Sequence, residues 1–307
     1  MTNQYDLIIL GTGAAGLTAA IYASRYNLNI LVIGKDGGMI TETSKVCNYP
    51  GFPDIDGSGL IDKFTEHAEK SGVKIVYDEV TNIEKSKSGF TIKTTNHNYN
   101  AKSIIYGFGG SKRKLGIEDE SKFMGKGVTY CATCDAAFYK KKKVMVTGGA
   151  NSAVSTVILL STIADQVYLV YRRNQLKAVP ALIDQITKKS NVKIMYEHNI
   201  KRIQGQKFVE SVIIEDTKGK QSEIKVDGIF VEFGCEPNSE LAEKVGVELT
   251  AEGRIKVNSD MSTNLPGFFA AGDVTNGSNQ FDQLITAGAE GSIAAASVSK
   301  YLRHQRV

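Results

Sequence analysis

The sequence contains little proline and cysteine and has almost no excess of charge of either sign. Of its 307 residues only 5 are proline and 4 are cysteine, and 37 basic against 33 acidic residues leave a net charge of +4. With 42% hydrophobic residues, this composition excludes intrinsic disorder and collagen-like repeats. The small net charge argues against nucleic acid as a partner.

Membrane and export signals are also missing from the sequence. No run of about 18 apolar residues, the length that spans a membrane, occurs in the chain. The first residues, Met1 to Leu7, have neither the basic region nor the apolar region of a signal peptide. We therefore expect a soluble, cytoplasmic protein with no membrane partner, whose length suggests two domains of about 150 residues each.

A glycine-rich turn follows the first apolar run of the chain. Leu7–Leu10 precede the pattern Gly11-x-Gly13-x-x-Gly16, and apolar residues then recur at helical spacing before a second apolar run at Ile30–Ile33. This order predicts a βαβ unit, in which small residues let the backbone approach a pyrophosphate at the N-terminus of the helix.

The acidic residue that would bind the ribose of NAD is out of register in this unit. It is expected at the end of the second strand, about 20 residues after the glycines. Gly34 and Lys35 stand there instead, and Asp36 lies slightly beyond. The first unit therefore favours FAD, or a variant way of holding the nucleotide, over NAD.

A related pattern of strand, turn and helix begins 137 residues later with Gly148, Gly149 and Ala150. Ala150 stands where the pattern has its second glycine, so its methyl group opposes close approach of the backbone to a pyrophosphate. No acidic residue follows the next strand, which ends at Tyr171.

Basic residues take the place of that acid. Arg172, Arg173 and Lys177 cluster just after the strand end, where arginine suits the 2′-phosphate of NADP. The alternative is a solvated basic turn that binds nothing. If this unit binds a nicotinamide nucleotide, the cluster favours NADP over NAD.

Two dinucleotide-binding patterns in one chain indicate an α/β protein with two Rossmann-like domains of three layers (ββα). Pro237-Asn238 ends a strand of the second unit, after which the chain can cross back, and an alanine-rich helix is expected from near Gln283. We therefore expect the second domain to be inserted into the first, with residues 1–114 and 242–307 forming one domain and 115–241 the other.

A close cysteine pair, Cys131-x-x-Cys134, is followed directly by Asp135. A zinc site would need four ligands, but Cys47 and Cys235 are isolated and the four histidines show no paired spacing, so no metal is expected. The pair suits a redox dithiol that exchanges with another disulfide through a mixed intermediate. Asp135 could give or accept the proton that a thiolate needs, or it could simply cap a helix or turn.

These residues resemble a known family, the low-molecular-weight thioredoxin reductases, which are FAD-dependent pyridine nucleotide-disulfide oxidoreductases. The resemblance runs essentially end to end. It is carried by the segments 11–23 (GTGAAGLTAAIYA), 48–52 (NYPGF), 130–135 (YCATCD) and 269–274 (FAAGDV), together with Gly234, Pro237, Asn238, Thr286 and Ala287.

The resemblance implies a homodimeric flavoprotein disulfide reductase. The first domain would hold FAD, and the inserted domain would carry the NADPH site and the redox disulfide, with Cys134 meeting the flavin and Cys131 attacking thioredoxin. The FAD contacts would come from Gly11, Gly13, Ala14, Ala15, Gly16, Gly38, Met39, Asn48, Gly272, Asp273 and Gln283. The NADPH contacts would come from Gly149, Asn151, Ser152, Arg172, Arg173 and Lys177.

Several positions depart from the family pattern, chiefly in the second unit. Ala150 replaces a glycine, Ser155-Thr156 replace an acidic pair, Tyr171 replaces a histidine, and Asp282 stands where arginine usually precedes a glutamine. NADPH is the favoured electron donor, and reduced ferredoxin is the alternative. A flavin-dependent dithiol oxidase, or a flavin-binding redox sensor that is not an enzyme, would also fit the cysteine pair.

Overall fold

The computed structural model describes residues 4–42, 46, 48–86, 88–130 and 132–305. The chain divides into two compact units. Unit 1 comprises residues 1–111 and 236–307, and unit 2 comprises residues 112–235. The inserted unit thus begins three residues before the expected boundary and ends six residues before it, since the segment 236–241 belongs to unit 1.

Unit 1 is built on a seven-stranded sheet with the order β3-β2-β1-β6-β5-β4, in which β17 also pairs with β6. Strands β1, β2, β3, β6 and β17 are parallel, whereas β4 and β5 form an antiparallel extension. The strands are β1 (Gln4–Leu10), β2 (Ile30–Gly34), β3 (Lys74–Tyr77), β4 (Val80–Ser86), β5 (Gly89–Thr94), β6 (Asn98–Tyr106) and β17 (Phe268–Ala270). The helices are α1 (Ala14–Ser24), η1 (Met39–Glu42, a 3₁₀ helix), α2 (Gly57–Lys70), α7 (Glu240–Lys244), η3 (Ser278–Gln280) and α8 (Leu284–His304).

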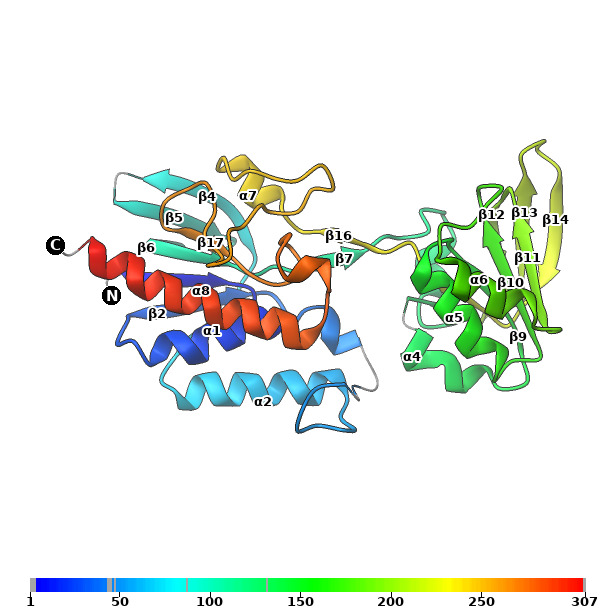
Figure 1. The fold of residues 1–307 in the computed structure, drawn as a ribbon, viewed down its shortest axis with the longest axis horizontal. Helices are drawn as coiled ribbons and strands as arrows, with labels where there is room; N and C mark the ends of the chain where they lie inside the picture. The colour runs from blue at the N-terminus through cyan, green and yellow to red at the C-terminus, as the bar shows by residue number, and fades with distance from the viewer. Residues whose placement is uncertain (1–3, 43–45, 47, 87, 131, 306–307) are drawn as a thin grey trace. The chain divides into compact units, whose positions relative to one another are not determined.

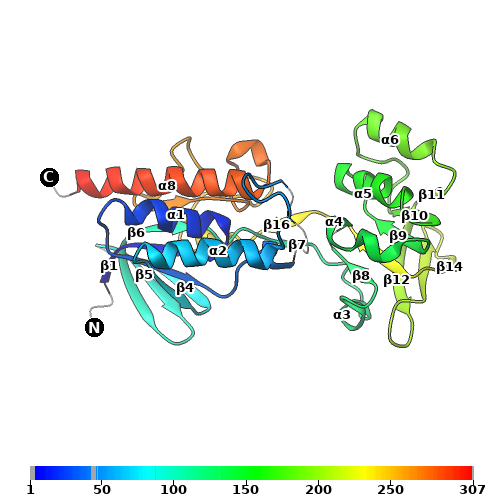
Figure 2. The same ribbon diagram turned by 90° about the horizontal axis from the view of Figure 1, so that it is seen from below.

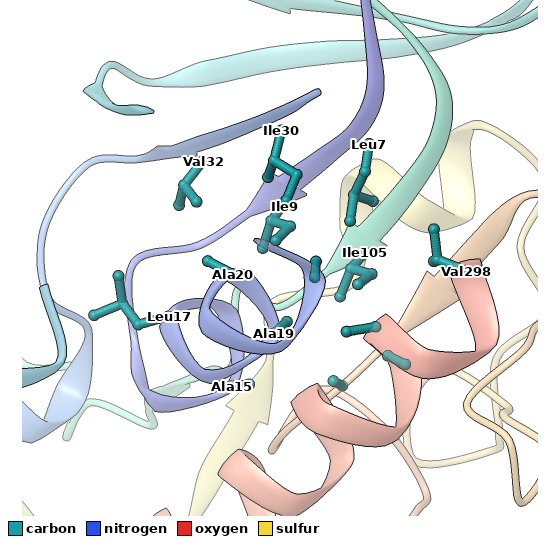
Figure 3. Packing of buried hydrophobic residues seen from close by; sticks show 14 of the residues in the cluster. Leu7, Ile9, Ala15, Leu17, Ala19, Ala20, Ile30, Val32, Ile105 and Val298 are labelled. Atoms are coloured by element: carbon teal, nitrogen blue, oxygen red, sulfur yellow. The ribbon is translucent and has the colours of Figure 1, made fainter. Parts of the chain in front are cut away.

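The sheet of unit 1 is buried on both faces. Helices α1, α2 and α8 lie on one face of the parallel strands, and β4 and β5, which continue the sheet from β6, curl over the other face, which gives three layers (Figures 1 and 2). Helix α1 packs against α8 through small residues, because a Cβ added at Gly291 would lie 2.2 Å from the carbonyl oxygen of Ala15. Figure 3 shows Ala15 and Ala19 of α1 close to α8, beneath Ile9 and Ile105 of the sheet.

Unit 2 repeats this plan with a five-stranded parallel sheet of order β11-β10-β9-β15-β8. Helices α4, η2, α5 and α6 pack on one face, and a three-stranded antiparallel sheet, β12-β13-β14, packs on the other together with α3. The strands are β8 (Val128–Thr129), β9 (Lys143–Thr147), β10 (Gln166–Tyr171), β11 (Val192–Tyr196), β12 (His198–Gln204), β13 (Ser211–Asp216), β14 (Gln221–Lys225) and β15 (Gly228–Val231). The helices are α3 (Glu120–Phe123), α4 (Ala132–Asp135), η2 (Ala136–Tyr139), α5 (Asn151–Ser161) and α6 (Pro180–Thr187).

The chain passes from one unit to the other through β7 (Gly110–Lys112) and returns through β16 (Cys235–Pro237), and the two strands pair with each other. On the side of unit 1, Asn238 fixes the returning strand. Its backbone N–H donates to the carbonyl of Gly109 (3.0 Å), its side-chain amide donates to that of Phe108 (3.1 Å), and its own carbonyl accepts from the Tyr106 hydroxyl (2.7 Å).

Candidate active site

The glycine turn of unit 1 contains two glycines at which a side chain would collide with the protein backbone, and a third at which it would not. Gly11 has φ +113°, and a Cβ there would lie 2.3 Å from the carbonyl oxygen of Gly107. A Cβ at Gly16 would lie 1.9 Å from the carbonyl oxygen of Gly11. Gly13, the N-cap of α1, has ordinary extended backbone, and the nearest protein atom to an added Cβ would be the Gly37 oxygen at 3.7 Å. The bare backbone at Gly13 therefore fits a ligand that approaches it closely.

Two further segments of unit 1 border this turn. A Cβ at Gly38 would lie 3.8 Å from the Cα of Gly13, so the loop that leads into Met39 adjoins the N-terminus of α1. A Cβ at Gly272 would lie 3.0 Å from the Cβ of Ala15. The fold thus brings Gly38 and Gly272 to the first turn of α1, where Ala14, Ala15 and Gly16 lie and where, among the described residues, no side chain caps the helix. Uncapped backbone N–H groups at a helix N-terminus attract anions such as a pyrophosphate.

Asp36, which lay beyond the position of a ribose-binding acid, is used within its own loop. Its carboxylate accepts a hydrogen bond from the backbone N–H of Gly38 (2.9 Å), and its carbonyl accepts one from the hydroxyl of Thr12. The carboxylate therefore shapes the loop that borders Gly13.

The other end of the chain closes the same site. The side-chain amide of Asn48 donates to the side-chain oxygen of Gln283 (3.0 Å), two residues that are 235 positions apart. Gln283 is also the N-cap of α8 and forms a capping box with Thr286. These contacts fix the start of α8 beside the segment that carries Asn48.

Asp273 is a partly buried carboxyl group with an unusual proton affinity. Burial, together with the nearby Asp282 and Glu290 carboxylates, raises the pKa of Asp273 to about 6, although the Arg254 guanidinium opposes the rise. Arg254 forms a bidentate pair with Asp282 (2.9 and 2.6 Å) and also donates to the carbonyl of Asp273 (2.7 Å). The backbone that carries Asp273 is therefore held by a nearly buried arginine.

Glu290 anchors the same turn from α8. It is buried, and one carboxylate oxygen accepts from the backbone N–H of Gly272 and from the hydroxyl of Thr275, each at 2.8 Å. Sequence analysis missed Glu290, Arg254 and the partner role of Asp282. A single acid on the apolar face of an alanine-rich helix was the available signal for Glu290, because such a residue is rarely buried unpaired.

The raised pKa of Asp273 leads to a prediction about stability. The folded state binds this proton more tightly than the unfolded state, whose aspartate pKa is about 3.9, so this carboxyl group lowers stability as the pH rises from about 4 to above 6. We expect Asp273→Asn, freed of FAD, to be more stable than the wild type at pH 8, by up to about 3 kcal/mol. Urea unfolding of both FAD-free proteins at pH 4 and pH 8 measures the difference.

The control for this prediction is Asp62→Asn, which removes an exposed aspartate on α2. Its stability should follow the wild type at both pH values. An Asp273→Asn variant that is no more stable than the wild type at pH 8 would show that the buried carboxylate carries no ionisation cost.

The glycine turn of unit 2 has a different arrangement of large and small residues. Gly148 has φ +143°, and a Cβ at Gly149 would lie 2.3 Å from the ring of Tyr171, which covers the turn from the end of β10. In unit 1 the equivalent positions, each 137 residues earlier, are Thr12 and Gly34, and a Cβ at Gly34 would lie 2.5 Å from the Thr12 hydroxyl. In each unit a side chain packs against a glycine at this contact. In unit 1 the side chain belongs to the turn residue, Thr12, and in unit 2 it belongs to the residue at the strand end, Tyr171.

Ala150 is the N-cap of α5, as Gly13 is of α1. Its backbone is extended, with φ −98°, and no side chain caps this helix either. The methyl group of Ala150 thus lies at the N-terminus of α5, beside the uncapped first turn that contains Asn151 and Ser152.

The basic residues of unit 2 lie on a loop that folds back on this turn. The backbone N–H of Lys177 donates to the carbonyl of Gly149 (2.7 Å), and that of Val179 donates to the side chain of Asn151 (2.9 Å). Arg172 and Arg173 follow β10 directly and are exposed, as is Lys177. The fold therefore brings the predicted cluster to the glycine turn while leaving its cations accessible to an anion.

A partly buried acid that was not predicted from the sequence, Glu232, directly follows β15. Glu232 accepts a hydrogen bond from the hydroxyl of Thr156 on α5 (2.8 Å), and burial raises its pKa, although this bond and the charge of Lys112 oppose the rise. Thr156 occupies one of the two positions where the family has an acidic pair. The acid in this contact comes from the residue after β15 and not from the helix.

Residues 132–135, which include Cys134, form α4, which lies between β8 and β9 in the chain. Cys131 and Cys47 lie outside the described residues, and for Cys134 only the backbone, within α4, is described. Asp135 ends α4 and precedes η2, but among the described residues its side chain caps neither helix. Its carboxylate instead accepts a hydrogen bond from the hydroxyl of Thr129, the last residue of β8.

The described part of the chain lacks two features. No group of three or more metal-ligating side chains occurs there, and no helix there is long and apolar enough to cross a membrane.

Comparison with known proteins identifies the family. The model of the pyridine nucleotide-disulphide oxidoreductases matches residues 5–291. The chain belongs to the pyridine nucleotide-disulphide oxidoreductases. This oxidoreductase is 38% identical to a thioredoxin reductase of Bacillus subtilis (strain 168) over 302 residues, which cover 97% of this chain and 95% of the relative. It is 42% identical to a 34.2 kDa protein in the rubredoxin operon of Clostridium pasteurianum over 306 residues, 98% of each chain.

A solved structure shows the same architecture. The oxidoreductase matches the crystal structure of Lactococcus lactis thioredoxin reductase in its FR conformation with a TM-score of 0.79 and 33% identity, over 98% of this chain and 99% of the other. These matches confirm the family expected from the sequence and the α/β fold with two Rossmann-like domains. The oxidoreductase is a flavoprotein disulfide reductase that uses FAD and NADPH, as its family does. The bare backbone at Gly13 and the uncapped start of α1 in unit 1 fit FAD.

Proposed function

We propose that this oxidoreductase transfers two electrons from NADPH to the disulfide of thioredoxin through Cys131 and Cys134. The observation that carries the proposal is the position of Cys134 and Asp135 on α4, within the unit that holds the second glycine turn, with the Asp135 carboxylate fixed by Thr129. A reducing compartment such as the cytoplasm suits a dithiol that must stay exchangeable.

The cysteines divide the exchange reaction between them. The Cys131 thiolate attacks the thioredoxin disulfide, which forms a mixed disulfide and releases one thioredoxin thiolate. The Cys134 thiolate then attacks the Cys131 sulfur, so that a Cys131–Cys134 disulfide forms and the second thioredoxin thiolate leaves. Each released thiolate takes a proton, and Asp135 supplies or relays it. FAD, when bound, provides the two electrons that reopen the disulfide.

Unit 1 is the proposed FAD site. The first turn of α1 would hold the pyrophosphate through its backbone N–H groups, with Gly13 keeping the approach open and Gly11 and Gly16 allowing the tight turn that precedes the helix. The remaining contacts would come from Ala14, Ala15, Gly38, Met39, Asn48, Gly272, Asp273 and Gln283. The support for this set is that contacts within unit 1 link most of these residues to the first turn of α1 or to the start of α8.

Unit 2 is the proposed NADPH site. Arg172, Arg173 and Lys177 would bind the 2′-phosphate by charge-assisted hydrogen bonds, and Gly149, Asn151 and Ser152 would meet the pyrophosphate. The exposure of the three cations beside the turn supports this assignment. The methyl group of Ala150 opposes close approach, so we expect weak binding.

Anaerobic reduction of the flavin tests the donor. NADPH should bleach the flavin absorbance, with a strong preference over NADH, because only NADPH carries the 2′-phosphate. Arg172→Ala should remove this preference by weakening NADPH about 10- to 100-fold, since a hydrogen bond to a charged group contributes about 1.5–3 kcal/mol. Ala150→Gly should strengthen the binding of both nucleotides. Stopped-flow absorbance with each nucleotide measures these rates.

The contrary result would name another donor. If millimolar NADPH reduces the flavin in neither the wild type nor Ala150→Gly, while dithionite does, the nicotinamide donor is wrong and reduced ferredoxin becomes the working model.

We also propose that the protein is a homodimer. Helix α8 exposes Ile285 and Ile293, and Phe281 just before it is exposed as well. Large apolar side chains on one surface helix are a feature of protein interfaces. Sedimentation analysis of the flavoprotein would measure the oligomeric state.

A further inference from the structure

The hydrogen bond between Thr129 and Asp135 joins the end of a strand to the acid of the proposed redox site. Thr129 ends β8, which pairs in parallel with β15 so that Thr129 lies opposite Phe230. Its side chain is 7% exposed. A β-branched residue in a buried strand has little rotational freedom about χ1, so the hydroxyl has a defined direction. It donates to Oδ2 of Asp135.

The ring of Tyr139, four residues after Asp135, is buried and held by packing. Burial, together with the charges of Asp135 and Asp227, raises the pKa of Tyr139 to about 12, so the Tyr139 phenol stays protonated at physiological pH. The ring of Tyr139 is held over Gly228, where an added Cβ would lie 2.2 Å from it, and it meets the ring of Phe230 edge-on. One group that feels the charge of Asp135 is thus held by packing, and Thr129 adds a directional bond to the carboxylate itself.

We propose that Thr129 is a positioning residue for Asp135 in the disulfide-exchange reaction. Because Oδ2 accepts the hydroxyl hydrogen, the proton that Asp135 transfers is carried on Oδ1. The bond also restricts rotation of the carboxyl group, so that Oδ1 keeps one direction through the catalytic cycle. This inference rests on the role of Asp135 given under Proposed function.

A purely structural role is the alternative. The bond would then only tie α4 to β8, and its loss would lower folding stability and activity to the same extent whether or not residue 135 can carry a proton. Double substitution separates the two roles, because residues that act through one another show non-additive effects.

The experiment compares Thr129→Val, which is nearly isosteric but lacks the hydroxyl, with Thr129→Ser, which keeps it. Both are made in the wild type and in Asp135→Asn, as FAD-loaded proteins. Steady-state turnover is measured with NADPH and a bacterial thioredoxin, with a chromogenic disulfide as terminal acceptor. Flavin content and urea unfolding are recorded for every variant.

We expect Thr129→Val to lower kcat on the order of tenfold, with the KM for thioredoxin unchanged within about twofold. Thr129→Ser should recover most of the wild-type kcat. Asp135→Asn alone should lower kcat about 100-fold or more, the usual contribution of a general acid. Adding Thr129→Val to Asp135→Asn should lower kcat no further.

Four results would overturn the inference. Equal losses of kcat from Thr129→Val in the wild type and in Asp135→Asn would show a structural role. A loss of flavin or of folding stability that explains the lower kcat would show the same, if it occurs in Thr129→Val and also in a second variant without the hydroxyl, Thr129→Ala. A wild-type kcat in Thr129→Val together with a slow Asp135→Asn would remove Thr129 from the mechanism and leave Asp135 in it. A wild-type kcat in Asp135→Asn would instead refute the proposed role of Asp135 itself.

Discussion

Replacing Cys134 by serine is expected to lower turnover at least about 10³-fold, as removal of a reacting nucleophile does, and to trap thioredoxin on Cys131. The trap forms because the Cys131 thiolate can still attack the thioredoxin disulfide, whereas the thiol that would resolve the mixed disulfide is gone. Intact mass spectrometry and non-reducing electrophoresis should show a complex of one thioredoxin with each chain, and a reductant should dissolve it.

Cys235 provides the matched control for this experiment. It is an exposed cysteine on β16, outside α4, and Cys235→Ser should turn over like the wild type and form no complex. Thioredoxin trapped in equal amounts by both serine variants would contradict the assignment. A wild type that holds tightly bound zinc and two permanently reduced thiols would replace the redox pair by a metal site.

Replacing Gly13 by valine is expected to release FAD while leaving unit 1 folded. The protein itself has room for a Cβ at this position, since its nearest atom would be 3.7 Å away, but a bound pyrophosphate would meet the added side chain. Crowding of this kind costs about 1–3 kcal/mol, or roughly 10- to 100-fold in FAD affinity. Flavin absorbance after dialysis, and titration of the FAD-free variant with FAD, measure the loss.

Gly16→Val is the control that distinguishes loss of FAD binding from loss of folding. A side chain at Gly16 would collide with the backbone at Gly11, so this variant should lose folding stability as well as flavin. Circular dichroism and urea unfolding should separate a folded, colourless Gly13→Val from a destabilised Gly16→Val. A Gly13→Val protein that keeps its flavin with unchanged affinity would place the cofactor elsewhere.

The backbone of this fold could be predicted because its signals are local. The apolar run before Gly11 predicts a strand, the glycines predict a turn, and the helical spacing of the apolar residues after them predicts a helix, all from neighbouring residues. The same signal at Gly148 predicted the second unit. The crossing points were displaced by a few residues because pairing between β7 and β16, and the contacts of Asn238 with Phe108 and Gly109, depend on chain segments far apart in sequence.

The electrostatic partners of the site could not be predicted because they depend on how the chain folds back on itself. Arg254 meets Asp282, 28 residues later, where the fold brings two loops together, and the Thr129 hydroxyl reaches Asp135 only because the chain turns back between β8 and α4. In the sequence, Asp282 replaces the arginine of the family pattern, which indicated the loss of a positive charge. In the fold, Asp282 pairs with the guanidinium of Arg254. Asp135 could equally have been a helix cap until its hydrogen-bond donor was located.

The exchange of large and small residues between the two glycine turns restricts how either half can change. A threonine at Gly149, to match Thr12, would collide with the Tyr171 ring, and a tyrosine at Gly34, to match Tyr171, would collide with Thr12. Neither substitution fits while the facing residue keeps its size, so the facing side chain must become smaller before the glycine is replaced by a larger residue. The intermediate, with glycine at both positions, leaves a void in a packed contact. The two turns are thus separated by an epistatic barrier, and residues transplanted between them should be exchanged as pairs.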